Sequence, residues 1–264
     1  MTARLTVVGG GRMGEALLTG LLAVGWARPD ELAVVEKLPD QRQRLAERHP
    51  DVVVAESVPP SEGAVIAVKP DDVQHACAAA AAARVARVLS IAAGVPLDSL
   101  EQWLPKGTPV VRAMPNTPAL VGAGAAAVAA GSAAGEEDLV WAESILSAVG
   151  VVVRVPESLL DAVTGLSGSG PAYVFLFAEA LVEAGVLVGL PRDVATVLAF
   201  QTLLGAARML DETDETAESL RAAVTSPGGT TAAGLRVLEA KGLRAAILEA
   251  VAAATERSRQ LGQA

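Results

Sequence analysis

Aromatic residues, histidine and cysteine are all scarce in this chain of 264 residues. Phe, Trp and Tyr make up only 3% of it, so a core must be built from Ala, Val and Leu, and such lean packing favours extra burial against another subunit. The single cysteine, Cys77, cannot form an intrachain disulfide and is expected to pack in a helix among alanines. The two histidines, His49 and His75, are expected at the surface, and they are too few to indicate a metal site.

Positive charge is also in short supply. The formal net charge is −9 and no basic stripe appears, which argues against nucleic acid and anionic membranes as partners. The most apolar helical pattern, 172–190, contains Glu179 and Glu183, and two carboxylates near the middle of a span are costly in lipid. No signal peptide pattern precedes the first strand pattern. We therefore expect a soluble, cytoplasmic protein in which 172–190 forms a buried helix.

Strand and helix patterns alternate up to about residue 155. The expected strands are 5–8, 32–35, 52–54, 65–68, 88–91, 110–111, 125–129 and 151–155. The expected helices between them include 15–24, 39–48, 71–83 and 135–148. This alternation predicts an α/β fold with a parallel sheet and helices on both faces.

After Pro156 the strand patterns stop and helix follows helix. The expected helices are 159–163, 171–188, 191–210, 216–224, 230–239 and 243–259. Pro171 and Pro191 stand where helices begin, as prolines at the first helical position do. We place two domains at 1–157 and 158–264.

A glycine pattern, GxGxxG, is formed by Gly9, Gly11 and Gly14 between the first strand and the first helix. In a dinucleotide site the first glycine permits the tight turn, the second lets the pyrophosphate approach the backbone, and the third allows close packing of helix on strand. An ordinary glycine-rich turn is the alternative. The place of the pattern, at the first strand–helix junction, favours the dinucleotide.

Glu36 follows the second strand, where an acidic residue accepts hydrogen bonds from the adenosine ribose of NAD and repels the 2′-phosphate of NADP. Lys37 is adjacent, and Arg42 and Arg44 open the next helix, which would suit NADP. A solvated surface cluster is the plainer interpretation of all four residues. The sequence leaves the choice between NADH and NADPH open.

Three further segments end predicted strands at the carboxyl edge of the sheet, where ligands bind in this architecture. They are 67–70, which contains Lys69, 90–94, and 114–118, which contains Asn116. A surface lysine and an asparagine that bonds its own backbone are the structural alternatives.

Two stretches of small residues, 165–173 and 226–231, each run into a helical pattern in the second half. We expect both to be loops whose backbone N–H groups hold a carboxylate at a helix start. Helix capping by Thr230 or Thr231 is the alternative for the second stretch. A dinucleotide at one end and a small acid at the other predict a dehydrogenase or reductase.

These motifs together resemble those of the pyrroline-5-carboxylate reductases over essentially the whole chain. The matching patterns are GGGxMGEAL at 9–17, AVKP at 67–70, AAGV at 92–95, MPNTP at 114–118, DAVTGLSGSGPAY at 161–173 and VTSPGGTT at 224–231. The last two are long, and few other families share them.

The resemblance implies reduction of 1-pyrroline-5-carboxylate to L-proline by hydride transfer from NADPH or NADH, the last step of proline biosynthesis. It implies an N-terminal Rossmann-like domain with a doubly wound, mainly parallel sheet, and a C-terminal all-α dimerisation domain. It also implies a homodimer, which in the family commonly assembles further into a pentamer of dimers.

The resemblance further implies roles for particular residues. The pyrophosphate would lie on Gly9, Gly10, Gly11, Arg12, Met13 and Gly14, and the rest of the cofactor would contact Glu36, Lys37, Ala67, Val68, Lys69, Pro70, Ile91, Ala92, Ala93 and Asn116. The substrate would bind Ser226, Gly228, Gly229, Thr230 and Thr231, with Thr231 as the catalytic hydrogen-bond donor to the ring nitrogen. Many family members carry a small polar residue where Glu36 stands.

Two other functions compete with this one. A related two-domain imine or hydroxyacid reductase would need a catalytic lysine in the first helix of the second domain, and 171–188 contains none. A non-catalytic NAD(P)-sensing protein would have no reason to keep the loop 226–231.

Overall fold

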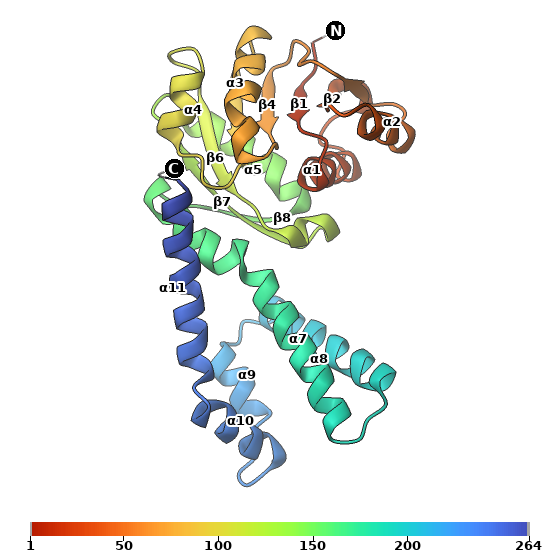
Figure 1. The fold of residues 1–264 in the computed structure, drawn as a ribbon, viewed down its shortest axis with the longest axis vertical. Coiled ribbons are helices and arrows are strands. Elements are labelled where there is room, and N and C mark those ends of the chain that lie inside the picture. Colours follow the sequence, from red (N-terminus) through yellow and green to blue (C-terminus); the bar gives the residue numbers. More distant parts are fainter. Residues whose placement is uncertain (1, 263–264) are drawn as a thin grey trace. The chain divides into compact units, whose positions relative to one another are not determined.

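The computed structural model describes residues 2–262. They fall into two compact units: the first runs to Ser169 and takes in the end of the last helix from Ala252 on, and the second is Gly170–Val251 (Figure 1).

The first unit is built on one eight-stranded sheet. Its strands are β1 (Leu5–Val8), β2 (Leu32–Val35), β3 (Val53–Ala55), β4 (Gly63–Ile66), β5 (Arg87–Ser90), β6 (Val110–Met114), β7 (Gly124–Ala130) and β8 (Gly150–Arg154). Their order in the sheet is β3-β2-β1-β4-β5-β6-β7-β8. β1 to β6 are parallel, β7 is antiparallel to β6, and β8 is parallel to β7. The chain winds outward from β1 in both directions, so the predicted doubly wound, mainly parallel sheet is confirmed.

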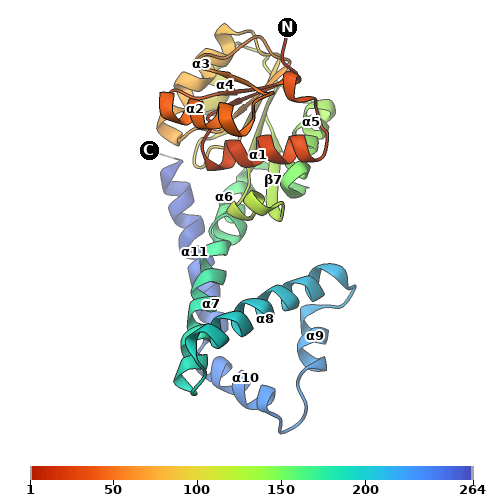
Figure 2. The ribbon, with the colours of Figure 1, turned by 90° about the vertical axis from the view of Figure 1, so that its right-hand side faces the viewer.

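Helices cover both faces of this sheet (Figures 1 and 2). One face carries α1 (Arg12–Ala23), α2 (Pro39–Arg48) and α5 (Glu136–Leu146), and the other carries α3 (Val73–Ala82), α4 (Leu97–Trp103) and α6 (Leu160–Val163). Neighbouring strand residues go to opposite faces: Val65 packs in the α1 layer and Ile66 in the α3 layer. This period of two in buried strands explains why their sequences are almost continuously apolar.

The sequence did not predict α4 or the reversal of direction at β7. α4 has only seven residues, of which Leu97 and Leu100 are buried, so it is too short to show a helical period. Strand direction is set by pairing with β6 and leaves no trace in the sequence of β7 itself.

The first small-residue stretch is helical, so its expected role as a carboxylate-binding loop was wrong. A π-helical turn, Thr164–Gly168, joins α6 to α7 (Gly170–Leu187). The Ser169 N–H donates to the Thr164 carbonyl (2.8 Å), which closes the wider π turn. A Cβ on Gly168 would lie 2.7 Å from the Met114 side chain. The small residues of this stretch therefore serve close packing of a continuous helix.

Cys77 is completely buried in α3, which confirms its expected packing role. Burial raises the pKa of its thiol to about 11, so the thiol stays protonated and unreactive at neutral pH. The expectation for His49 was wrong. Its Nε2 is buried and lies 4.0 Å from a carboxylate oxygen of Glu15, because the end of α2 packs against α1. His75 is exposed, as expected.

The second unit is helical throughout its described elements, but it buries little of its own apolar surface. It holds α7, α8 (Arg192–Glu212), α9 (Ala217–Ala223), α10 (Thr230–Ala240) and the first part of α11 (Leu243–Leu261) (Figure 2). α7 and α8 pack on each other through Val182, Ala195 and Ala199. Pro191 precedes α8 as its N-cap instead of occupying the first helical position.

Most apolar side chains of α7 and α8 are exposed in the single chain. Within α7 only Ala178 and Val182 are buried, so the expected buried helix is not buried by its own chain. The large exposed side chains of the two helices include Val174, Phe175, Leu176, Phe177, Leu187, Val197, Leu198, Phe200, Leu204, Met209 and Leu210. By length and composition alone, Glu157–Leu187 and Arg192–Glu212 are apolar enough to cross a membrane. An apolar patch of this extent marks an interaction surface.

A partly buried ion pair fixes the start of α4 in the first unit. Arg112 of β6 is 9% exposed, and its Nη1 donates to Glu157 Oε1 at 2.8 Å. The same oxygen accepts the Leu97 N–H at 2.7 Å, at the first residue of α4.

Replacing Glu157 by Ala would leave a buried guanidinium and a helix N–H without their acceptor. We expect Glu157→Ala to lower the free energy of unfolding by about 1–3 kcal/mol. The exposed Glu137, on α5, supplies the matched control Glu137→Ala, which should change it by about 0.5 kcal/mol or less. Urea unfolding followed by circular dichroism measures both, and equal losses in the two variants would contradict the role given to Glu157.

Candidate active site

A cavity of about 430 Å³ lies at the carboxyl ends of β1, β2, β3 and β4, beside α3. Residues from four separate turns line it, and all four turns follow neighbouring strands. The predicted cofactor residues that line it are Gly9, Gly11, Glu36, Lys37, Ala67, Val68 and Lys69. The fold therefore brings these seven predicted cofactor residues together. They lie where doubly wound sheets bind ligands.

The glycine turn is shaped by close backbone contacts. Gly9 has φ +109°, and a Cβ there would lie 2.6 Å from the Ala67 carbonyl oxygen at the end of β4. A Cβ on Gly14 would lie 2.0 Å from the Gly9 carbonyl oxygen, so only glycine lets α1 sit this close to β1. Gly11 differs, because no atom beyond its own chain neighbours lies within 4 Å of its Cβ position and the space above it is open. This openness suits a pyrophosphate approaching the backbone.

The N-terminus of α1 opens at the same turn. Gly11 is its N-cap residue, and no side chain supplies a capping hydrogen bond there. The first backbone N–H groups of a helix lack intrahelical acceptors, and the helix dipole adds positive potential. Arg12, Met13 and Gly14 thus offer donors to an anion, and the turn fits the pyrophosphate of a dinucleotide.

The Glu36 side chain occupies the turn after β2. Its Oε2 accepts the Gly10 N–H at 3.2 Å and its Oε1 accepts the Leu38 N–H at 3.0 Å. Lys37 points to a different partner, with Nζ 3.6 Å from an Asp72 carboxylate oxygen. Arg42 binds the carbonyl oxygens of Glu36 and Lys37 at 2.9 and 2.7 Å.

The sequence did not assign several residues that line this cavity. They are Val8, Val35, Leu38, Glu56, Ser57, Val58, Asp72, His75, Ala76 and Ala79. A signal for Glu56, Ser57 and Val58 was available, because they directly follow β3 and share its carboxyl edge. The residues on α3 give no such signal, since only the packing of α3 on the sheet turns them toward the cavity.

Other predicted residues lie at the same edge without lining the cavity. Pro70 begins a 3₁₀ turn, Pro70–Asp72, and Ile91, Ala92 and Ala93 follow β5. Arg12 lines a different hollow, of about 570 Å³, together with Arg44 and Arg48. The backbone of Arg12 therefore belongs to the glycine turn, whereas its side chain does not.

Asn116 bonds to the protein through both ends of its amide. Its Nδ2 donates to the Ser167 carbonyl at 3.0 Å and its Oδ1 accepts the Ala125 N–H at 2.8 Å. The side chain thus ties the turn after β6 to the π-helical turn and to β7. Its assignment as a cofactor contact remains a prediction.

The second small-residue stretch forms the predicted loop and belongs to the second unit. Gly228 adopts φ +69°, the Gly229 N–H donates to the Ser226 carbonyl at 3.0 Å, and α10 begins at Thr230. Gly229 is the N-cap residue and no side chain caps the helix, so the capping alternative for Thr230 and Thr231 was wrong. Thr231 is exposed, in the first turn of α10. The loop therefore offers uncapped N–H donors beside a hydroxyl.

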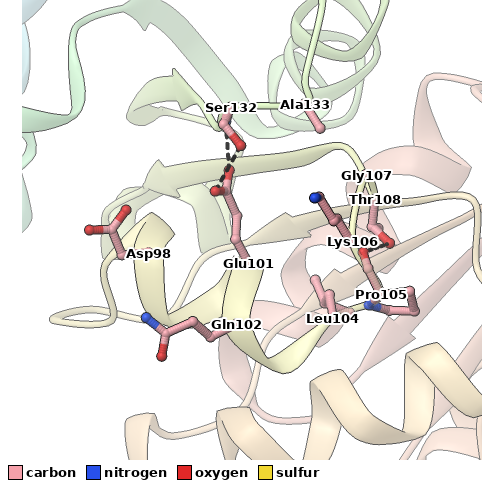
Figure 3. Close-up of a pocket in the computed structure, with 10 residues that line it drawn as sticks. All are labelled: Asp98, Glu101, Gln102, Leu104, Pro105, Lys106, Gly107, Thr108, Ser132 and Ala133. Carbon is pink, nitrogen blue, oxygen red and sulfur yellow. Dashed lines mark hydrogen bonds between the residues drawn. The ribbon is translucent and has the colours of Figure 1, made fainter.

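Cavity size alone does not locate the site. Another hollow, of about 470 Å³, lies at the other end of the strands (Figure 3). The residues that line it precede β6 or follow β7 in the chain. Glu101 of α4 reaches across it and accepts the N–H and hydroxyl of Ser132 at 2.5 and 2.9 Å. None of the predicted site residues lines this hollow.

Comparison with known proteins identifies the family. Residues 157–261 match the model for pyrroline-5-carboxylate reductase dimerisation, and residues 4–94 match that for NADP oxidoreductase, coenzyme F420-dependent. A pyrroline-5-carboxylate reductase of Mycobacterium tuberculosis is 48% identical over 98% of this chain and 97% of its own length. This chain belongs to the pyrroline-5-carboxylate reductase family. The resemblance seen in the motifs is thereby confirmed.

Relatives of this family match along the whole chain. The pyrroline-5-carboxylate reductase of a Synechocystis strain is 47% identical over 100% of both chains. The solved structure of the Coxiella burnetii reductase covers 99% of each chain, with a TM-score of 0.92 and 38% identity. That of the Plasmodium falciparum enzyme, solved with NADP bound, covers 98% of each chain, with a TM-score of 0.85 and 29% identity.

The open space above Gly11 yields a test of the dinucleotide site. A methyl group at Gly11 meets no protein atom but projects where the pyrophosphate approaches, so we expect Gly11→Ala to weaken NAD(P)H binding by about tenfold or more. Gly135, the N-cap of α5, also has open space at its Cβ position. Gly135→Ala should lower the free energy of unfolding by as much as Gly11→Ala does, about 1 kcal/mol or less, and should leave NAD(P)H binding unchanged. Fluorescence titration with the reduced cofactor measures the affinity, and equal affinities in the two variants would place the pyrophosphate elsewhere.

Proposed function

We propose that this protein reduces 1-pyrroline-5-carboxylate to L-proline by hydride transfer from NADH or NADPH, the last step of proline biosynthesis. The observation that carries the proposal is the dinucleotide cavity at the carboxyl ends of β1 to β4, in a chain 47–48% identical to pyrroline-5-carboxylate reductases over its full length. The uncapped start of α10, with its adjacent hydroxyl, supports the substrate side.

The nicotinamide cofactor supplies the hydride when it is bound. The chain's own residues bind and orient it: the open turn at Gly11 and the N-terminus of α1 receive the pyrophosphate, and Glu36 faces the adenosine end. The turns 67–70 and 91–93 follow β4 and β5 at the same edge and are assigned to the ribose and nicotinamide. The protein then promotes the reaction by holding substrate and cofactor close together in the reactive orientation. Such positioning can lower the activation barrier by on the order of 7–11 kcal/mol at best.

On the substrate side, the loop 226–231 is assigned the carboxylate. Gly228 and Thr230 present backbone N–H groups, while that of Gly229 closes the loop on the Ser226 carbonyl. The Thr231 hydroxyl donates a hydrogen bond to the ring nitrogen that becomes the amine of proline. A protonated imine is already electrophilic, so no histidine is needed as an acid or base. This agrees with the sparse histidines, since a hydroxyacid dehydrogenase would need a residue to move the alcohol proton.

A related hydroxyacid reductase and a non-catalytic NAD(P) sensor remain the competing functions. α7 carries no lysine, which counts against the first. The experiment is to follow NADH and NADPH oxidation by absorbance with pyrroline-5-carboxylate added, and to identify L-proline as product. Cofactor binding without turnover would favour the sensor.

The working form is proposed to be a homodimer that assembles further into a pentamer of dimers, in the cytoplasm and apart from membranes. The exposed apolar side chains of α7 and α8 lie within residues 157–261, which match the family's dimerisation model. Burial against a second copy accounts for these side chains, and it also supplies the core that the second unit lacks.

We expect Thr231→Ala to lower turnover by about a hundredfold while leaving the affinity for NAD(P)H unchanged. The reason is that the hydroxyl acts on the imine nitrogen and not on the cofactor. Thr231→Ser restores the hydroxyl and should recover most of the rate. Thr196, a partly exposed helical threonine of α8, provides the control Thr196→Ala. Steady-state kinetics give the rates, and a Thr231→Ala enzyme as fast as the parent would remove Thr231 from the mechanism.

We expect Phe175→Asp to dissociate the dimer, because a carboxylate would be forced into an apolar interface. Phe175 is 62% exposed in the single chain. Val24 in the first unit is 61% exposed and lies outside residues 157–261, so Val24→Asp is the matched control. Sedimentation velocity over a range of concentrations measures the masses. A Phe175→Asp protein that keeps the parent's mass would contradict this interface.

A further inference from the structure

The adenosine end of the dinucleotide cavity carries more negative than positive side chains. The acidic residues that line it are Glu36, Glu56 and Asp72, and the basic ones are Lys37 and Lys69. We infer that this cavity selects a dinucleotide with a free 2′-hydroxyl and rejects one with a 2′-phosphate, so that NADH is the reductant. The inference rests on the proposed function and deepens it by naming the cofactor.

Glu36 is held in place by the turn that it faces. Its two oxygens accept N–H groups from Gly10, in the turn after β1, and from Leu38, in the turn after β2. A carboxylate has about four lone-pair sites, so two remain for other donors. The hydroxyls of a ribose diol are donors, whereas a phosphate ester at the 2′ position offers only acceptors and a charge of about −1.5 to −2. Because Glu36 is fixed, it cannot turn away from that charge.

Arg42 is the arginine closest along the chain to Glu36, and it is already engaged. Its Nη1 donates to the carbonyls of Glu36 and Lys37, and its Nη2 lies 3.5 Å from a Glu56 carboxylate oxygen. The side chain is only 23% exposed. A bidentate grip on a phosphate would require Arg42 to give up these partners. Arg42 therefore rigidifies the turn after β2 instead of serving a phosphate.

Neither Lys37 nor Arg44 supplies a fixed guanidinium in its place. Lys37 is 70% exposed and pairs loosely with Asp72. Arg44 lines the other hollow with Arg12 and Arg48, away from this cavity. The carboxylates of Glu36 and Asp72 thus meet an incoming 2′-phosphate without a free guanidinium to offset the repulsion.

The test measures binding separately from catalysis. Fluorescence titrations of the full-length protein with NADH and with NADPH give two dissociation constants, and we expect NADH to bind about tenfold or more tightly. Glu36→Ser should lower this preference by about tenfold or more, since it removes an acceptor for the ribose and a charge facing the phosphate. Asp72→Asn should shift the preference in the same direction by a smaller factor, without disturbing the Gly10 and Leu38 contacts of Glu36.

Glu47→Gln is the matched control, because Glu47 is exposed on α2 and bonds only to the Gln43 side chain among the contacts of the described chain. It removes the same charge and should leave the ratio of dissociation constants unchanged. Circular dichroism confirms that each variant is folded. If Glu36→Ser does not fold, Asp72→Asn still decides the outcome.

Tighter or equal binding of NADPH by the parent would overturn the inference, as would an unchanged ratio in the folded Glu36→Ser and Asp72→Asn variants. Turnover of pyrroline-5-carboxylate with NADPH preferred would overturn only the choice of cofactor. Preferential binding of NADH without turnover would overturn the proposed function and leave the inference standing.

Discussion

The close seating of α1 on the sheet is the contact on which the site depends. A Cβ at Gly14 would lie 2.0 Å from the Gly9 carbonyl oxygen, and a Cβ at Gly9 would lie 2.6 Å from the Ala67 carbonyl oxygen. Any side chain at either position would push α1 or β4 away. The uncapped start of α1 and the turn after β4 border one cavity because these backbones touch.

The two units obtain their stability in different ways. The first buries a layer of small aliphatic side chains on each face of its sheet, and Arg112 and Glu157 add a fixed ion pair at one helix start. The second buries only a few residues between α7 and α8. Its exposed apolar residues lie in the segment that matches the family's dimerisation model. Burial of these residues between two chains would supply the apolar core that the second unit lacks on its own.

A protein with few histidines is suited to catalysis by proximity and orientation of its bound reactants. The proposed reaction needs a bound hydride donor and an oriented imine, and it needs little acid–base chemistry. The described chain carries two kinds of binding group: the helix starts at Arg12 and Thr230 offer N–H donors, and the carboxylates of Glu36 and Glu56 line the cavity at the carboxyl ends of β1 to β4. The proposed selectivity for the cofactor therefore relies on negative side chains, and the proposed recognition of the substrate relies on the positive ends of helices.

The sequence by itself determined the alternating α/β architecture, the glycine turn and the family, because strand period, turn glycines and long motifs are local properties of the chain. Only the tertiary structure decided that 164–168 is a π-helical turn, that β7 runs antiparallel to β6, and that Asn116 bonds Ser167. It alone also gave Arg42 to the Glu36 and Lys37 carbonyls and to Glu56. These features depend on which distant segments meet, and packing between them, unlike backbone preference, leaves no periodic mark in the sequence.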